Sequence, residues 1–261
     1  MGFIRGGISF VLAILLLLSL LIANSFFVVS SSLDYENVKP QLISSFKNLA
    51  DEQGNLTEIV NEKYPAMQMY CAQDNTAFVF SYEELDMVFE IPCEIIQEGA
   101  EQIIDYVIED FLEKIYYKKY DCGLFDCVSE NEIPFYIISE HTKNYCKGKF
   151  YLFLVIILIF MALMLLVFEN KANALMMVGA LAIISSLPFM KVEAFVSPIS
   201  NFEFLKFFTL FFTKAYSVFL IVFITGLVIL ALGIGLRFWK FKGKQEISSE
   251  DKFKPKNEKK K

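Results

Sequence analysis

The sequence predicts a membrane protein of the all-α class, with four transmembrane helices and a mostly α-helical, disulfide-containing extracytoplasmic domain between the first and second spans. Three observations support this prediction. First, 55% of the 261 residues are hydrophobic, and they gather in long uncharged blocks. Second, residues 33–149 hold 23 acidic and only 9 basic side chains, a net charge of −14. Third, all five cysteines lie in this acidic segment, as expected for an oxidising compartment.

Residues 1–30 are predicted to form a short leader and the first transmembrane helix. The run from Ile8 to Val29 supplies 22 mostly apolar residues, which span a bilayer core at about 1.5 Å per residue. Ala23 and Ser25 would also suit a signal-peptidase site, so a cleaved signal peptide is the alternative. The apolar run continues past that site, which favours an anchor that stays in the chain.

Residues 31–149 are predicted to form the extracytoplasmic helical domain. Ser31, Ser32 and Asp34 mark a helix start, and apolar residues at helical spacing follow up to Gly54. The segment 64–71 around Pro65 is expected to be irregular. Residues 76–80 suit one strand or a packed loop. The capping box in residues 81–84 predicts a brief helix that ends before Pro92.

The clearest helix of this domain is predicted from Glu94 to Lys119. Apolar residues recur at helical spacing from Ile96 to Ile115, and we expect this stripe to form the core of the domain. The opposite face is acidic. Because it lacks the Asp-x-Asp-x-Asp-Gly loop of an EF-hand, we expect a solvated face and no metal site. Its members are Glu94, Glu98, Glu101, Asp105 and Glu109.

The cysteines are candidates for disulfide bonds, and their pairing is left open by the sequence. Five is an odd number, so at most two intrachain bridges form and one thiol is left over. Asn55, in the sequence Asn-Leu-Thr, is a candidate glycosylation site if the domain is exported. The disulfide candidates are Cys71, Cys93, Cys122, Cys127 and Cys146.

Residues 150–236 are predicted to contain three more transmembrane helices. The spans are 150–168, 174–190 and 215–236, and none of them holds a charged residue. An interfacial segment is expected near residues 201–213, where polar residues recur on one helical face among phenylalanines. Glu203, Lys206 and Lys214 belong to this possible membrane polar face.

Residues 237–261 form a basic tail that we predict to be cytoplasmic and disordered. It holds ten basic and four acidic side chains. With Arg5 and Lys171, these charges satisfy the positive-inside rule if both termini are cytoplasmic and residues 31–149 lie outside the cell membrane. The rule explains the basic tail without a nucleic-acid partner.

The sequence carries no recognisable catalytic signature. His141 is the only histidine, which argues against a histidine-rich metal site or a Ser-His-Asp triad. We therefore expect a non-enzymatic protein without a cofactor, serving in protein interaction or as a subunit of an envelope complex. The expected partners are the lipid bilayer, a protein bound through the extracytoplasmic domain, and a second copy of the chain. The alternative is a small channel or transporter subunit that uses the polar face Glu203–Ser217.

Overall fold

The computed structural model describes residues 2–53, 56–73, 75–82, 87–119, 137–192 and 209–252. The chain divides into two compact units. The first, here called the bundle unit, combines Met1–Val29 with Cys146–Lys261. The second, the polar unit, comprises Ser30–Tyr145.

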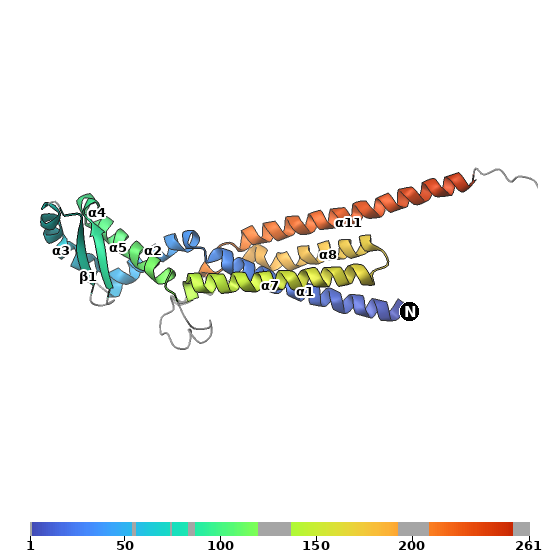
Figure 1. Cartoon of the computed structure of the whole chain (residues 1–261), viewed down its shortest axis with the longest axis horizontal. Helices are drawn as coiled ribbons and strands as arrows, with labels where there is room; N and C mark the ends of the chain where they lie inside the picture. The colour runs from blue at the N-terminus through green and yellow to red at the C-terminus, as the bar shows by residue number, and fades with distance from the viewer. Residues whose placement is uncertain are drawn as a thin grey trace, which may run out of the picture. The chain divides into compact units, whose positions relative to one another are not determined.

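The bundle unit is built from long apolar helices (Figure 1). They are α1 (Gly2–Ser32), α7 (Glu140–Val167), α8 (Lys171–Ser186) with its 3₁₀ continuation η3 (Leu187–Lys191), and α11 (Ala215–Lys252). Within the described residues, four helical stretches are long and apolar enough to cross a membrane. They are Arg5–Ser32, Glu140–Val167, Lys171–Lys191 and Ala215–Trp239. The four stretches agree with a multi-pass membrane protein.

The outward faces of these helices are apolar as well. Phe10 is 66% exposed on α1, Leu166 is 80% exposed on α7, and Ile224 is 56% exposed on α11. Soluble monomers rarely expose contiguous apolar surface of this kind, whereas lipid tails accept it at no cost. The helices therefore have the surface of a membrane bundle.

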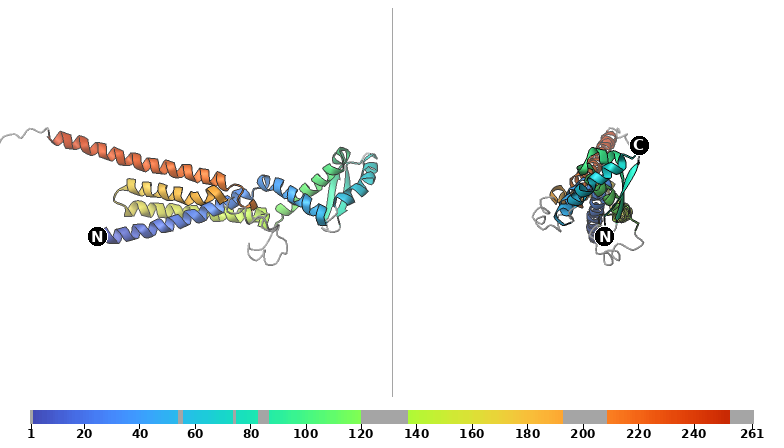
Figure 2. Two further views of the ribbon diagram at one scale, coloured as in Figure 1. Left: turned by 180° about the vertical axis from the view of Figure 1, so that it is seen from behind. Right: turned by 90° about the vertical axis from the view of Figure 1, so that its left-hand side faces the viewer.

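Helices α8 and α11 run antiparallel and touch through glycines, and both views in Figures 1 and 2 place them side by side. A Cβ atom added at Gly179 would lie 2.6 Å from the backbone nitrogen of Leu230. One added at Gly233 would lie 2.8 Å from the backbone nitrogen of Met176. Small residues allow helix backbones to approach this closely in lipid. The glycines of α8 and α11 thus fix the closest helix pair of the bundle.

Two apolar clusters join α1 to the other helices. In one, Leu16 of α1 packs with Met164 of α7 and Val178 of α8. In the other, Val28 of α1 packs with Phe189 of η3 and with the first turns of α11. The Arg5 side chain also pairs with Glu169, so the start of α1 and the α7–α8 connection share one end of the bundle unit.

The polar unit combines helices with a two-stranded sheet (Figure 2). Its elements in chain order are α2 (Tyr35–Gln53), α3 (Leu56–Cys71), β1 (Ala77–Tyr82), β2 (Met87–Pro92), α4 (Cys93–Glu98) and α5 (Ala100–Tyr116). Strands β1 and β2 are antiparallel. Helix α5 supplies much of the core through Ile103, Val107 and Phe111, and the Phe111 ring meets that of Phe46 on α2 at 5.2 Å.

Two of the expected elements in this unit are wrong. Residues 64–71 are not irregular, because α3 passes through Pro65 and buries Val60 and Met67 on one face. That burial outweighs the cost of a proline inside a helix. The brief helix expected after residues 81–84 is replaced by β2. Its alternating residues Phe89 and Ile91 are fully buried opposite β1, and this period of two outweighs the capping signal.

Two helix boundaries also differ from the expectation. The helix predicted from Glu94 to Lys119 is broken into α4 and α5 at Gly99, which has a φ of 128° that other residues rarely adopt. Helix α11 does not end at Leu236 but continues to Lys252 into the segment predicted to be disordered. Its charged residues allow helix to continue beyond the apolar span, since lysine, arginine and glutamate are good helix formers.

Candidate functional site

The clearest candidate site is the free edge of the two-stranded sheet in the polar unit. The register pairs Phe80 with Phe89 and Val79 with Glu90. Paired residues share one face of a sheet, and successive pairs alternate between faces. Phe80 and Phe89 are buried toward the helices, whereas Val79 is 61% and Val88 57% exposed on the opposite face. The hairpin therefore buries one face and offers the other to its surroundings.

The hydrogen bonds of β2 show which edge is covered. Tyr106 Oη donates to the Glu90 carbonyl oxygen at 3.2 Å, and Lys114 Nζ donates to the Val88 carbonyl oxygen at 3.4 Å. Both donors belong to α5. The two carbonyl groups thus point away from β1, and α5 donates a hydrogen bond to each of them.

The pairing pattern of the two strands also determines which backbone groups of β1 point away from β2. Opposing residues in an antiparallel pair alternate between hydrogen-bonded and non-hydrogen-bonded pairs. The Cys93 N–H donates to the Thr76 carbonyl oxygen at 3.0 Å, which fixes that pair as hydrogen-bonded. Ala77, Val79 and Ser81 therefore direct their N–H and C=O groups away from β2. We call these six groups the β1 edge, and among the described residues no hydrogen bond reaches them.

A disulfide and side-chain contacts link the base of the hairpin to the neighbouring helices. A disulfide joins Cys71, the last residue of α3, to Cys93, the first of α4, with the two Cα atoms 5.5 Å apart. The Tyr70 ring meets the Phe78 ring edge-on at 5.4 Å. Tyr64 Oη donates to the Ile96 carbonyl oxygen at 3.2 Å. These contacts tie β1 and α4 to α3 at the base of the hairpin.

The acidic face of α5 is partly neutralised within the polar unit. Lys39 of α2 pairs with Glu109, and Lys47 pairs with Asp105. The hydrogen bond from Lys39 to Glu109 raises the pKa of the lysine. The described residues contain no group of three or more side chains suited to hold a metal ion. Because acidic residues outnumber basic ones by 14 in residues 33–149, the domain keeps a strong negative field.

A polar contact lies inside the bundle unit. The Asn24 side chain of α1 is buried, and its Nδ2 lies 3.3 Å from Ser185 Oγ and 3.5 Å from the Ser185 carbonyl oxygen on α8. Such contacts between membrane helices contribute about 0.6 kcal/mol on average. Asn24, which interrupts the first apolar block, thus has a structural partner on α8.

The site residues expected from the sequence are distributed unevenly. Cys71 and Cys93 are joined, and Cys146 is buried in α7 without a disulfide to any described residue. Lys214 directly precedes α11. The remaining candidates lie outside the described residues, namely Asn55, Cys122, Cys127, Glu203 and Lys206. The polar face Glu203–Ser217 and the channel function based on it therefore stay predictions from the sequence.

The β1 edge is not among the sites that the sequence predicts, because the pattern at residues 81–84 predicts a helix where β2 lies. A signal was present, since Phe89 and Ile91 alternate with Val88 and Glu90 directly before Pro92. Pro92 occupies a position whose N–H would point away from β1, where a proline costs no hydrogen bond between the strands.

The chain was compared with known proteins, and no family model, no curated protein and no solved structure matches it.

Proposed function

We propose that the chain is a non-enzymatic multi-pass membrane protein whose polar unit binds a partner protein by adding one of the partner's strands to the β1 edge. The outward N–H and C=O groups of Ala77, Val79 and Ser81 support the proposal. An extended peptide can pair with such groups and gain main-chain hydrogen bonds, while exposed side chains provide selectivity. Val79, exposed beside this edge, offers the apolar contact.

Charge favours a basic partner segment over a second copy of this chain. Residues 33–149 have a net charge of −14, so two copies of the domain would repel each other. Glu90 lies on the exposed face of the sheet, opposite Val79. A segment that alternates apolar and basic residues would satisfy both the valine surface and the acidic field.

We further propose that residues 31–149 lie outside the cell membrane and that both termini are cytoplasmic. The Cys71–Cys93 disulfide suits an oxidising compartment. Arg5 and Lys171 lie at the end of the bundle unit where α1 begins and α8 begins, and the positive-inside rule assigns that end to the cytoplasm. A membrane-impermeant thiol reagent, applied after reduction, should label Cys71 and Cys93 in intact cells; labelling only after lysis would contradict this orientation.

The strand-addition proposal is tested with a pair of labelled peptides and the full chain in nanodiscs. One peptide alternates valine and lysine, and the other alternates valine and glutamate. We expect fluorescence anisotropy to show saturable binding of the lysine peptide alone. Failure of the lysine peptide to bind, or equal binding of the two, would contradict the proposal.

A proline substitution distinguishes edge pairing from simple charge attraction. The Val79 N–H points away from β2, so Val79→Pro removes a donor from the β1 edge and spares the bonds between the strands. Loss of one hydrogen bond of about 1 kcal/mol should weaken the peptide about fivefold. The matched control Val79→Thr keeps the N–H and the branched side chain, and it should bind like the native chain. Equal affinities for the two variants would show that the edge is not used.

A further inference from the structure

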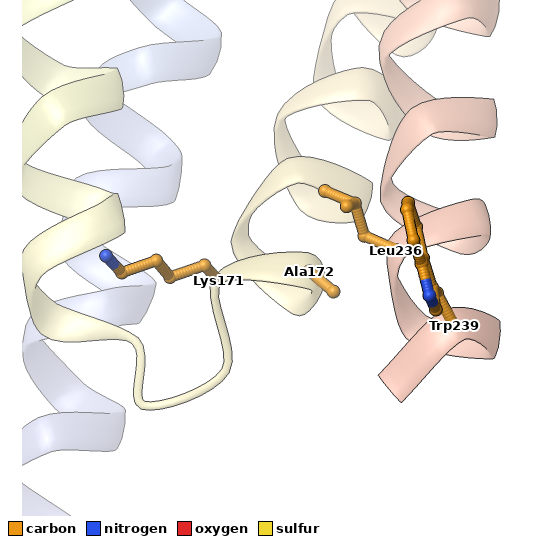
Figure 3. A pocket seen from close by; sticks show the side chains of 4 residues that line it. All are labelled: Lys171, Ala172, Leu236 and Trp239. Carbon is orange, nitrogen blue, oxygen red and sulfur yellow. The ribbon is translucent and has the colours of Figure 1, made fainter. Parts of the chain in front are cut away.

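An open hollow of about 440 Å³ lies at the end of the bundle unit where α8 begins (Figure 3). Ala172 of α8 and Leu236 and Trp239 of α11 give it apolar walls, and the Lys171 side chain extends away from Trp239. Lipid tails are as apolar as leucine, so these walls do not distinguish one apolar occupant from another. The polar unit, in contrast, presents a charged group beside the β1 edge.

Helix α3 packs along β1 on the side of the sheet that buries Phe80. Near the end of the helix, the Tyr70 ring meets the Phe78 ring edge-on at 5.4 Å. Two turns earlier, Lys63 Nζ lies 5.3 Å from the centre of the Phe80 ring. Met67, between these two positions on the same face of α3, is fully buried. One face of α3 therefore follows β1 and holds an ammonium group over its fourth residue.

Two lysines stand over the paired phenylalanines of the sheet, and their surroundings differ. Lys114 of α5 lies 5.2 Å from the centre of the Phe89 ring, pairs with Asp110 and donates to a carbonyl oxygen of β2. Lys63 has the corresponding position over Phe80 and is exposed. It forms no ion pair or hydrogen bond with another described residue. The charge of Lys63 is thus available beside the strand whose outward backbone groups are open.

A strand added at the β1 edge would direct alternate side chains to the two faces of the sheet. On the exposed face they would lie beside Val79, with Glu90 on the strand beyond. A lysine suits this position, because its aliphatic stem covers the valine and its ammonium group reaches toward the carboxylate. On the other face the side chains would meet α3. There Lys63 repels a lysine and attracts a carboxylate.

We propose that Lys63 selects the partner strand by pairing with one carboxylate on its α3-facing side. The selection rests on the proposed addition of a strand at the β1 edge, and it specifies the chemistry of that strand. Basic residues lie on the exposed face, apolar residues face α3, and one aspartate or glutamate lies beside Phe80. The net charge of −14 in residues 33–149 disfavours acidic residues elsewhere in the partner strand, so the preference is reversed locally at Lys63.

Three labelled peptides and the full chain in nanodiscs test this selection. All three alternate valine and lysine, and they differ only at one central valine, which is kept, replaced by glutamate or replaced by glutamine. Shifts of the peptide by two residues leave each side chain on its face, so the altered residue can reach Lys63. We expect fluorescence anisotropy to show about threefold tighter binding of the glutamate peptide than of the glutamine peptide, as for a partly exposed ion pair.

Substitutions show whether Lys63 is the residue that recognises the carboxylate. Lys63→Gln should bind the valine peptide at least as tightly, which shows an intact edge, and should lose the preference for glutamate over glutamine. Lys63→Glu should reverse that preference. Lys119→Gln is the matched control, since it removes the same charge beyond the end of α5 and should keep the preference. A preference retained in Lys63→Gln, or lost equally in Lys119→Gln, would overturn the proposal.

The valine peptide separates strand addition from selection by Lys63. If it binds the native chain while the glutamate and glutamine peptides bind with equal affinity, strand addition stands and selection by Lys63 is wrong. If none of the three peptides binds, strand addition at the β1 edge and selection by Lys63 are both contradicted.

Discussion

Tyr116 Oη donates a hydrogen bond of 2.7 Å to the backbone carbonyl oxygen of Leu33, a residue 83 positions earlier in the chain. Both residues are buried, and the bond ties the last turn of α5 to the short link between the end of α1 at Ser32 and the start of α2 at Tyr35. The Tyr35 ring packs on that of Tyr116 at 5.0 Å. In contrast to Tyr116, the buried Tyr35 hydroxyl has no hydrogen-bond partner in the described part of the chain.

This difference predicts opposite effects for the same substitution. Tyr116→Phe leaves the Leu33 carbonyl without its partner and should lower the free energy of unfolding by about 1–3 kcal/mol. Tyr35→Phe removes a buried hydroxyl that has no partner, and it should leave stability unchanged or raise it by up to about 1 kcal/mol. Hydrogen exchange of peptides from residues 87–119, measured on the full chain, tests both. Equal destabilisation by the two changes would contradict the assigned hydrogen bond.

The tyrosine pair also predicts sensitivity to alkaline pH. Burial, with a smaller effect from Glu113, raises the pKa of Tyr35 from 10.0 to about 12. Burial raises the pKa of Tyr116 as well. Because the folded state keeps these protons longer than the unfolded chain, the stability is fully present below pH 10 and is lost as the pH rises through about 12. Near-ultraviolet circular dichroism should follow this loss, and Tyr35→Phe should move its onset to higher pH. A native spectrum above pH 12 would contradict the prediction.

The glycine contact between α8 and α11 predicts a position-dependent effect of adding one methyl group. At Gly179 the new Cβ would lie 2.6 Å from the backbone nitrogen of Leu230. Gly179→Ala should therefore separate the two helices and lower stability by about 1–3 kcal/mol. Gly235→Ala is the matched control, because its Cβ would enter open space. Titration of the full chain with a denaturing detergent gives the unfolding midpoint of each variant. Equal unfolding midpoints for Gly179→Ala and Gly235→Ala would contradict the close helix contact.

The disulfide predicts one definite pair of linked peptides. Cys71 and Cys93 are 22 positions apart, and a crosslink over that distance stabilises a fold by about 3 kcal/mol in the chain-entropy description. Cys71→Ser and Cys93→Ser should each cost about this amount, whereas Cys146→Ser should leave the bridge intact. Mass spectrometry of the alkylated, unreduced chain identifies the linked peptides. A bridge from Cys71 to Cys122 or Cys127 would contradict the assigned pairing.

The apolar helices were predictable because their signal is local. The span expected at 150–168 lies almost wholly within α7, and that expected at 215–236 lies within α11. A run of about 20 apolar residues has few stable alternatives in a bilayer. No distant partner is needed to identify it.

The hairpin was harder to predict because a short strand is defined by its partner. Residues 76–80 alone allow a strand or a loop, and only the register with β2 decides between them. The capping pattern at residues 81–84 is a local signal that opposes this register. Burial of Phe89 and Ile91 favours the strand. This burial depends on packing against other elements, so a pattern of neighbouring residues does not predict it. The β1 edge is therefore defined only through the register of β1 with β2.

The cover that α5 lays over β2 has a consequence for stoichiometry. A sheet with two open sides can recruit one chain after another and grow without limit. Here Tyr106 and Lys114 donate to the outward carbonyl groups of β2, so the proposed guest strand would add at the β1 edge and complete a three-stranded sheet. Under the strand-addition proposal, we therefore expect one guest strand per polypeptide.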